Sequence, residues 1–382
     1  MHTNSHIEIN QNALQNNIDF LKKLYGKKVI LSSVVKGNAY GHGIPEFVRS
    51  AFSCGVTHFS VFDADEARAV KKELQDKVSI LIMGFVSDED IFWAIENNVS
   101  FYVFDKVRMQ KTIKIAKKLN RKAFIHIEVE TGMNRTGFEK SELSWVAKML
   151  KENTDALIFE GLCTHYAGAE SVSNFYRIEK QISNFTTAEN FFKNENLVPT
   201  IRHSACSAAS IMFPETRMDL VRIGIMQYGL WSSPEVFVHY LNSKKIKKDP
   251  LQRIISWKSE VMSVKKVNPG DYIGYGTSFM ASEKMKVAII PVGYSHGYSR
   301  SLSNHGRVLI NGKRCMVIGT VNMNMLTVNV SDLESVKKGD EAVLIGNQED
   351  ISISIASFSD FSNTLNYELL TRLDKGIPRK II

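Results

Sequence analysis

The strongest constraint on the fold is a regular alternation of short apolar runs with amphipathic stretches. Eight runs have the length and the β-branched or aromatic content of buried strands. They lie at residues 29–35, 57–63, 78–84, 99–105, 122–130, 156–165, 200–205 and 220–225. The stretches between them carry helical periodicity, notably at residues 45–54, 64–75, 88–98, 106–120 and 141–153. Strict alternation implies parallel pairing with right-handed crossovers, so eight units predict an α/β fold, a closed (β/α)8 or TIM barrel, and favour it over a doubly wound open sheet.

The sequence pattern changes after a lysine-rich segment, NSKKIKKDP, at residues 242–250. Beyond it, short strand patterns are separated by NPGD, NG and KKGD turns, which is typical of an all-β domain. We therefore expect a barrel over residues 1–240. A β-rich C-terminal domain should follow over residues 241–382.

Composition excludes several classes of protein. The chain has 382 residues and a net charge of +8, but its basic residues lie among acidic ones on helical faces, which argues against nucleic-acid binding. Cys54, Cys163, Cys206 and Cys315 are scattered, so neither a metal site nor a disulfide framework is predicted. The start lacks a signal-peptide pattern, and no stretch approaches about 18 apolar residues. We expect a cytoplasmic protein without membrane contacts.

Chemically distinctive residues gather where the predicted strands end, the position of the active site in TIM barrels. They are Lys36, Arg135, His165, Ser207 and Arg222, at the first, fifth, sixth, seventh and eighth runs. Each has an ordinary explanation by itself, such as a solvated strand exit, a loop cation, a core histidine or a helix cap. Five of them at one barrel mouth predict a functional site.

An anion site is indicated after the last two runs. The small residues of HSACSAAS, at residues 203–210, and the Gly224–Ile225 pair would let backbone N–H groups approach a phosphate at a helix N-terminus. A strand-end lysine together with a phosphate site points to pyridoxal 5'-phosphate, whose aldehyde binds a lysine amine covalently.

The motifs VVKGNAYGHG, ETGMNRTGF, LVRIGIMQYGL, YGTSF, PVGYSHG and LNYELL occur in this order along nearly the whole chain. In this the chain closely resembles the alanine racemase family, the barrel-type pyridoxal-phosphate enzymes. The resemblance implies that Lys36 carries the cofactor, Arg222 faces its pyridine nitrogen, Arg135 lies beside its phenolic oxygen and His165 stacks near the ring or contacts Arg222. It further implies a phosphate site made of Tyr40, Ser207, Gly224, Ile225 and Tyr367.

The resemblance also gives the second domain a role. Tyr275 in YGTSF matches the family's second catalytic base, which acts in the partner subunit of a head-to-tail homodimer. Racemisation removes a proton from one face of the α-carbon and returns one to the other, so two acid–base groups on opposite faces suffice. In the family the lysine, here Lys36, acts on the D-enantiomer and the tyrosine on the L-enantiomer. The expected activity is therefore interconversion of L- and D-alanine, which supplies D-alanine for bacterial peptidoglycan.

Two other functions stay open at this stage. A barrel-type amino-acid decarboxylase shares the two-domain plan, but its resemblance would predict an acidic residue where Arg222 stands. A non-catalytic pyridoxal-phosphate-binding protein could keep Lys36 and the phosphate loop, but such proteins resemble the barrel alone. The β domain and Tyr275 favour an enzyme.

Substrate preference is left open by departures from the family pattern. Asn322 and Asn324 flank Met323, whose backbone N–H contacts the substrate carboxylate in the family. Cys206 replaces an asparagine, and His296 in GYSHG replaces an aspartate. Racemases for serine or for larger amino acids vary in this region and are the alternative.

Two further residues are expected to support the site, Tyr294 in PVGYSHG and Glu128 in IHIEVETGMNR. Strand alternation puts His126, Glu128 and Glu130 on one face, which should point into the barrel. Many alanine racemases have a carbamylated lysine at the position of Glu128, and it hydrogen-bonds the arginine that matches Arg135. We expect Glu128 to supply that anion directly, with a salt-bridged glutamate at the barrel mouth as the alternative.

Overall fold

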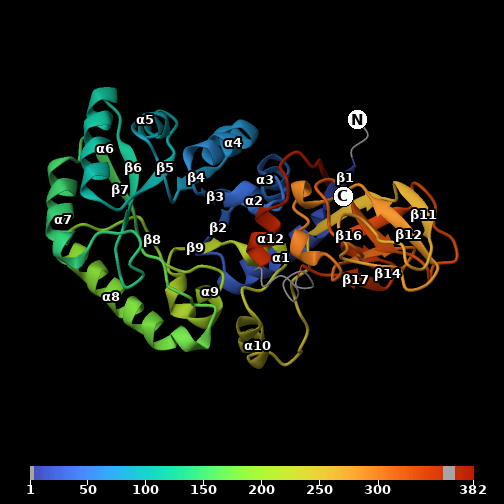
Figure 1. Ribbon diagram of the computed structural model, residues 1–382. Helices are drawn as coiled ribbons and strands as arrows, with labels where there is room; N and C mark the ends of the chain where they lie inside the picture. Colours follow the sequence, from blue (N-terminus) through green and yellow to red (C-terminus); the bar gives the residue numbers. More distant parts are fainter. Residues whose placement is uncertain (1–3, 356–365) are drawn as a thin grey trace. The chain divides into compact units, whose positions relative to one another are not determined.

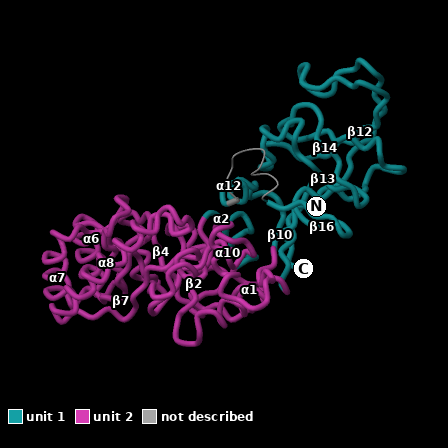
Figure 2. Tube along the Cα trace, turned by 90° about the horizontal axis from the view of Figure 1, so that it is seen from below, with its two compact units in different colours: residues 1–11, 37–47, 254–382 teal, residues 12–36, 48–253 magenta. Residues whose placement is uncertain are grey.

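A computed structural model of the protein describes residues 4–355 and 366–382. The chain divides into two compact units, neither of which is continuous in sequence (Figure 2). Residues 12–36 and 48–253 form one, here called the barrel unit, and residues 1–11, 37–47 and 254–382 form the other, here called the β unit. The boundary predicted near residue 240 stays a prediction.

The barrel unit is built on eight parallel strands paired in the order β8-β7-β6-β5-β4-β3-β2-β9. The strands are β2 (Ile30–Val34), β3 (His58–Val61), β4 (Ser79–Ile82), β5 (Ser100–Val103), β6 (Ala123–Glu128), β7 (Leu157–Cys163), β8 (Ile201–His203) and β9 (Leu220–Ile223). The two ends of this order meet, because Asp219 N donates to Arg202 O at 3.1 Å and Arg222 N to Ala205 O at 3.0 Å. The predicted (β/α)8 barrel is confirmed, with one strand at each of the eight predicted runs.

Helices follow the strands and lie outside them (Figure 1). The longer ones are α1 (Gln11–Tyr25), α3 (Ile44–Ser53), α4 (Ala64–Leu74), α5 (Asp88–Glu96), α6 (Lys106–Leu119), α7 (Leu143–Glu152), α8 (Phe175–Asn194) and α10 (Pro234–Asn242). The short ones are η1 (Gln75–Lys77), η2 (Lys140–Glu142), η3 (Val172–Asn174), α9 (Ala209–Met212), η4 (Pro214–Arg217) and η5 (Ile225–Tyr228). Among the described residues no helix combines the length and the apolar character that a bilayer span requires.

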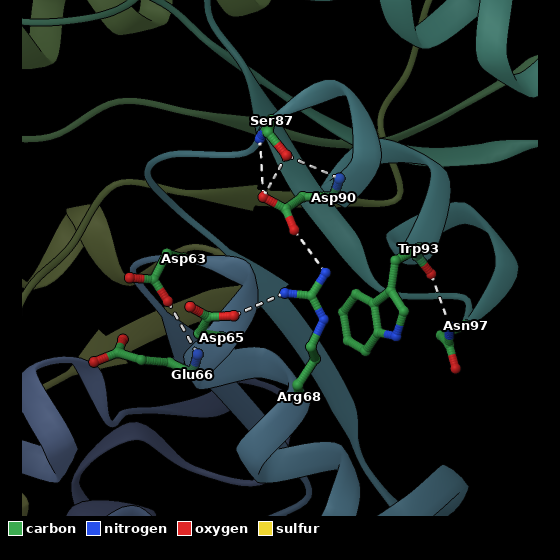
Figure 3. Close-up of polar contacts among 8 residues, drawn as sticks. All are labelled: Asp63, Asp65, Glu66, Arg68, Ser87, Asp90, Trp93 and Asn97. Carbon is green, nitrogen blue, oxygen red and sulfur yellow. Dashed lines mark hydrogen bonds and ion pairs between the residues drawn. The ribbon is translucent and has the colours of Figure 1, made fainter.

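Side-chain caps fix where two neighbouring helices begin (Figure 3). The Asp63 carboxylate accepts from Glu66 N at 3.0 Å at the start of α4, and Ser87 with Asp90 forms a capping box on α5. Such caps stabilise a helix by about 1 kcal/mol each. Arg68 of α4 then donates to Asp90 at 2.6 Å and lies over the ring of Trp93, 4.8 Å from its centroid. These contacts join α4 to α5 on the outside of the barrel.

The β unit contains two sheets and a short helix. The larger sheet has the order β14-β13-β16-β10-β1-β18, with β17 paired to β16, and the smaller has the order β11-β12-β15. The strands are β1 (Ser5–Ile9), β10 (Ile255–Glu260), β11 (Ser263–Val267), β12 (Met285–Ile290), β13 (Arg307–Ile310), β14 (Lys313–Met316), β15 (Leu326–Asn329), β16 (Glu341–Gln348), β17 (Ile351–Ile353) and β18 (Arg379–Ile381). The helical segments are η6 (Tyr294–His296), η7 (Arg300–Leu302) and α12 (Asn366–Thr371). The mainly β C-terminal part predicted from the sequence is confirmed.

Candidate active site

Eight of the predicted site residues belong to the barrel unit and lie at or just beyond the C-terminal ends of its strands. They are Lys36 after β2, Glu128 and Arg135 at and after β6, His165 after β7, Ser207 after β8, and Arg222, Gly224 and Ile225 at and after β9. Parallel strands place these ends at one edge of the barrel. The barrel thus gathers residues that are up to 189 positions apart along the chain, from Lys36 to Ile225.

Lys36 is a strong candidate nucleophile. Part of the residue is exposed to solvent. The pKa of its amine is nevertheless lowered, first by burial within the surrounding protein and then by the Arg135 guanidinium. No described residue forms a hydrogen bond or an ion pair with this amine. A lowered pKa increases the fraction of neutral, nucleophilic amine near neutral pH, as attack on a carbonyl requires.

Arg222 is almost completely buried and its guanidinium is held at four points. Nη2 donates to Thr164 O at 2.8 Å and to Ser204 O at 2.9 Å, while Nη1 donates to His203 O at 3.2 Å and to His203 Nδ1. The four Nη hydrogens are thereby engaged. Nε–H remains as the one donor of this side chain without a partner among the described residues.

His165 lies beside Arg222, with Nδ1 3.4 Å from Nη2. Burial, followed by the positive charge of Arg222, lowers the pKa of His165 to about 3. The imidazole is therefore neutral at physiological pH and can lie against an aromatic ring or accept a hydrogen bond. The contact between His165 and Arg222 agrees with one of the two roles expected for this histidine.

The candidate phosphate site is a loop cradle. Ser207 Oγ accepts from Gly224 N at 3.1 Å, which joins the loop after β8 to the loop after β9. Ile225 opens η5, so its N–H lies at the start of a helical turn. The helix after Ser207, α9, has only four residues, so its dipole adds little and the hydroxyl and loop N–H groups are the relevant donors.

Tyr40 lies in a left-handed turn that directly follows Lys36. Gly37, Asn38, Ala39 and Tyr40 have φ values of 64°, 56°, 52° and 51°. For residues other than glycine this conformation costs about 1–2 kcal/mol each. His42 stabilises the turn, since its Nδ1–H donates to the carbonyls of Ala39 and Tyr40, both at 2.9 Å.

The same turn brings two predicted phosphate ligands together. The rings of Tyr40 and Tyr367 have centroids 5.9 Å apart, and Tyr367 lies on α12. A Cβ on Gly41 would stand 1.9 Å from Leu370 O, so only glycine allows the turn to approach α12 this closely.

Glu128 is 4% exposed at the end of β6. Burial raises the pKa of its carboxyl, and a hydrogen bond with Thr136 opposes that rise. Among the described residues its Oε2 atom has no hydrogen-bond partner, and no ion pair joins the carboxylate to Arg135. The expected link between the two side chains therefore stays a prediction.

Glu130 is a residue whose role the sequence did not reveal. Its carboxylate accepts from four successive N–H groups in the loop after β6, among them Met133 at 2.7 Å, Asn134 at 2.9 Å and Arg135 at 3.3 Å. Burial opposes its ionisation, but these hydrogen bonds outweigh burial and lower its pKa. The carboxylate shapes the loop that presents Arg135. A glutamate just before a TGMN turn is the only sequence signal.

Tyr275, Tyr294 and Met323 belong to the β unit. Tyr275 is 74% exposed, and Tyr294 and Met323 are also exposed. Tyr294 N donates to Asn322 O and Ser295 N to Met323 O, both at 3.0 Å, so two predicted segments lie side by side. The substituted residue His296 accepts from Gly293 N at 3.2 Å through Nδ1 and so closes the turn that carries Tyr294.

Comparison with known proteins gives matches along both parts of the chain. The family model described as "Alanine racemase, N-terminal domain" matches residues 9–232, and that described as "Alanine racemase, C-terminal domain" matches residues 254–381. An alanine racemase of Leptospira interrogans is 33% identical, covering 99% of this chain and 96% of the relative.

Solved structures give the same result. The alanine racemase of Bacillus anthracis with bound L-Ala-P is 31% identical with a TM-score of 0.91, and 100% of this chain and 96% of that chain are covered. The alanine racemase of Bartonella henselae with covalently bound pyridoxal phosphate is 26% identical with a TM-score of 0.85, and both chains are covered completely.

Proposed function

This chain belongs to the alanine racemase family, and from that premise we propose that it interconverts L-alanine and D-alanine with pyridoxal 5'-phosphate as its cofactor. The observation that carries the proposal is the amine of Lys36, which has a lowered pKa and lies at the end of a barrel strand near two arginines. Without that amine the same fold would have no covalent anchor for the cofactor.

The donors at the barrel mouth fit the cofactor group by group. Lys36 offers an amine for the aldehyde, and Arg222 offers an unpartnered Nε–H for a ring nitrogen. The Ser207 hydroxyl and the Ile225 N–H are suited to a phosphate, and the Gly224 N–H would exchange Ser207 Oγ for a phosphate oxygen. We assign Arg135 to the phenolic oxygen and His165 to the ring, and Tyr40 with Tyr367 to the phosphate.

When bound, the cofactor would hold the amino acid covalently and acidify its α-C–H bond. Lys36 Nζ then accepts the proton from the α-carbon of the D-enantiomer, or returns one to form it. Tyr275 Oη does the same on the opposite face, for the L-enantiomer. Arg135 is assigned as the cationic neighbour that assists Tyr275 in this transfer.

Arg222 determines which reactions are favoured. A guanidinium stays protonated at all relevant pH values, so Arg222 donates to the ring nitrogen without transferring a proton to it. Arg222 would therefore leave that nitrogen uncharged and would limit the spread of negative charge away from the substrate. This disfavours transamination, and the position of an arginine here also argues against a decarboxylase.

The proposal includes a homodimer in which Tyr275 of one protomer serves the site of its partner, and Met323 N–H binds the substrate carboxylate. The exposed Tyr275 side chain supports this arrangement. Alanine is the proposed substrate, with serine or a larger amino acid as the alternative because Asn322, Asn324 and Cys206 depart from the family pattern. The corresponding cellular role is to supply D-alanine for bacterial peptidoglycan, from an enzyme in the cytoplasm.

One experiment tests cofactor attachment and substrate together. Purified protein is reduced with borohydride and digested, and the peptide that contains Lys36 should carry the cofactor. A panel of L-amino acids is then assayed for D-enantiomers by chiral chromatography, with alanine expected to react fastest. Lys36→Ala should lose both signals. Cofactor on another lysine, or catalysis by Lys36→Ala, would refute the assignment.

A further inference from the structure

A continuous line of hydrogen bonds crosses the interior of the barrel unit from Arg222 to Glu160. His203 Nε2 lies 2.8 Å from His126 Nδ1, and His126 Nε2 lies 2.9 Å from Glu160 Oε2. Arg222 Nη1 contacts His203 Nδ1 at one end, and Ser100 Oγ donates to Glu160 at the other. These five residues, here called the imidazole chain, come from the adjacent strands β5 to β9.

The two ends determine where every proton lies. An arginine only donates, so His203 accepts at Nδ1 and carries its hydrogen on Nε2. That hydrogen is donated to Nδ1 of His126, which therefore carries its own hydrogen on Nε2. An ionised carboxylate only accepts, and Glu160 receives this last hydrogen. All the hydrogen bonds thus point from Arg222 toward Glu160.

Local backbone structure makes room for the imidazole chain. The pairing of β6 with β7 shifts by one residue, so that Ile125 lies opposite Phe159 but His126 lies opposite Gly161, and Glu160 is the additional residue. Bulges of this kind redirect side chains. A Cβ on Gly161 would stand 2.1 Å from His126 Nδ1, so glycine is required beside the ring.

The charge of the buried Arg222 guanidinium suggests what the imidazole chain does. Arg222 is 4% exposed, and among the described residues no carboxylate forms an ion pair with it. A buried cation without an ion pair is costly. The charge of Glu128 also acts on Arg222, but burial raises the pKa of the Glu128 carboxyl. Burial, then the charge of Arg222, lowers the pKa of His203 well below its ordinary value, so this imidazole stays neutral. Burial opposes ionisation of Glu160, but the hydrogen bonds from His126 and Ser100 help to lower its pKa, so it is an anion.

We propose that Glu160 is a positioning residue that acts through His126 and His203 to hold Arg222 in place and in charge balance. The inference rests on the proposed function only in assigning Arg222 to the ring nitrogen of the cofactor. Hydrogen bonds in series polarise one another, so the carboxylate makes His203 Nδ1 a stronger acceptor and aligns the guanidinium that presents Nε–H. Partners of this outer kind typically change affinity or activity by about 10- to 100-fold.

The first test uses the chain without cofactor, so it does not depend on catalysis. In protein labelled with ¹⁵N-histidine, NMR should show His126 and His203 as neutral rings with the proton on Nε2. Glu160→Gln weakens the terminal acceptor, and both Nε2–H resonances should move upfield. Ser100→Ala leaves the carboxylate intact with one donor fewer, and both should move downfield. Glu189→Gln, which alters a partly exposed ion pair with Arg202, should move neither.

The second test compares two ligands. Glu160→Gln should bind pyridoxal phosphate about tenfold more weakly, but 1-deazapyridoxal phosphate, whose ring nitrogen is replaced by carbon, as well as the parent does. A merely structural defect would weaken both equally and would overturn the proposal. The proposal would also be overturned by a proton on Nδ1 of His203, or by a His203 resonance that does not move in either Glu160→Gln or Ser100→Ala. If the parent protein bound no pyridoxal phosphate, the proposed function would fall, while the resonances would still report whether Glu160 is coupled to His203.

Discussion

At the scale of single residues, the buried carboxyl of Glu128 gives the sharpest prediction. Within the part of the chain that the structure describes, its Oε2 has no hydrogen-bond partner. It is therefore available to fix Arg135 by a charge-assisted hydrogen bond when the site is loaded. Glu128→Gln should reduce turnover about tenfold or more, measured as steady-state racemisation, and added bicarbonate should not change the parent's rate. Glu139→Gln, at an exposed position nearby, is the control. Parent-like turnover with unchanged cofactor affinity in Glu128→Gln would leave Glu128 as an ordinary barrel residue.

Glu130 gives a prediction about pH. Its folded-state pKa lies below the ordinary value of 4.5 because loop N–H groups stabilise the carboxylate despite burial. The stabilisation is therefore fully present above the unfolded-state pKa and is lost as the pH falls through the folded value. The difference in unfolding free energy between the parent and Glu130→Gln should be greatest near pH 7 and should shrink on acidification below about 4.5. A difference that does not vary with pH would contradict this reading.

The sequence predicted the residues at the strand ends, and for a physical reason. Lys36 and Arg222 stand where apolar runs stop, and parallel strands bring such positions to one edge. Glu130 and Glu160 were not assigned a role because their function depends on hydrogen bonds to other segments. For Glu160 this includes a one-residue shift in strand pairing, which no local pattern encodes.

At the scale of elements, the left-handed turn after Lys36 is sensitive to a single methyl group. Gly41→Ala places a Cβ at φ +80° and 1.9 Å from Leu370 O, whereas Gly26→Ala has φ +78° and no neighbour within 4 Å. Gly26→Ala should cost about 1 kcal/mol of stability from backbone strain alone. Gly41→Ala should cost clearly more, measured by chemical denaturation, and should weaken cofactor binding. Equal losses would show that contact with α12 is unimportant.

The elements also show what patterns can and cannot predict. The predicted helices at 64–75 and 106–120 begin at the same residues as α4 and α6, and they end one residue after them. Acidic N-caps and periodic apolar faces are local signals, so such helices can be predicted. The left-handed turn at residues 37–40 was not predicted from the sequence. Its left-handed conformation depends on contacts with His42 and α12, and the second of these is remote in sequence.

At the scale of the whole molecule, the barrel and the mainly β part were both predictable, because a change of periodicity marks them. The sequence did not predict that residues 1–11 and 37–47 group with residues 254–382. The cause is long-range pairing: β1 lies antiparallel to β10 and parallel to β18, so the first strand belongs to a sheet built mostly from the end of the chain.

The proposed dimer predicts complementation between inactive subunits. Tyr275→Phe should bind cofactor but lose racemisation in both directions, since one proton transfer is typically worth a factor of roughly 10² to 10⁴. Lys36→Ala should also be inactive. Mixed dimers of the two should contain one site with both Lys36 and Tyr275, and purified heterodimers carrying two different tags should recover activity. Confirmed heterodimers that remain inactive would exclude a site shared between subunits.

The proposed activity requires this protein to remove and return the α-proton of alanine on opposite faces. The most direct measurement is to incubate the holoenzyme with L-alanine in D₂O and to follow both enantiomers by chiral separation and mass spectrometry. We expect D-alanine that carries deuterium at the α-carbon, progress to equal amounts of the two enantiomers, and no reaction with Lys36→Ala. Recovery of unlabelled L-alanine without D-alanine, or conversion to a keto acid or an amine, would contradict it.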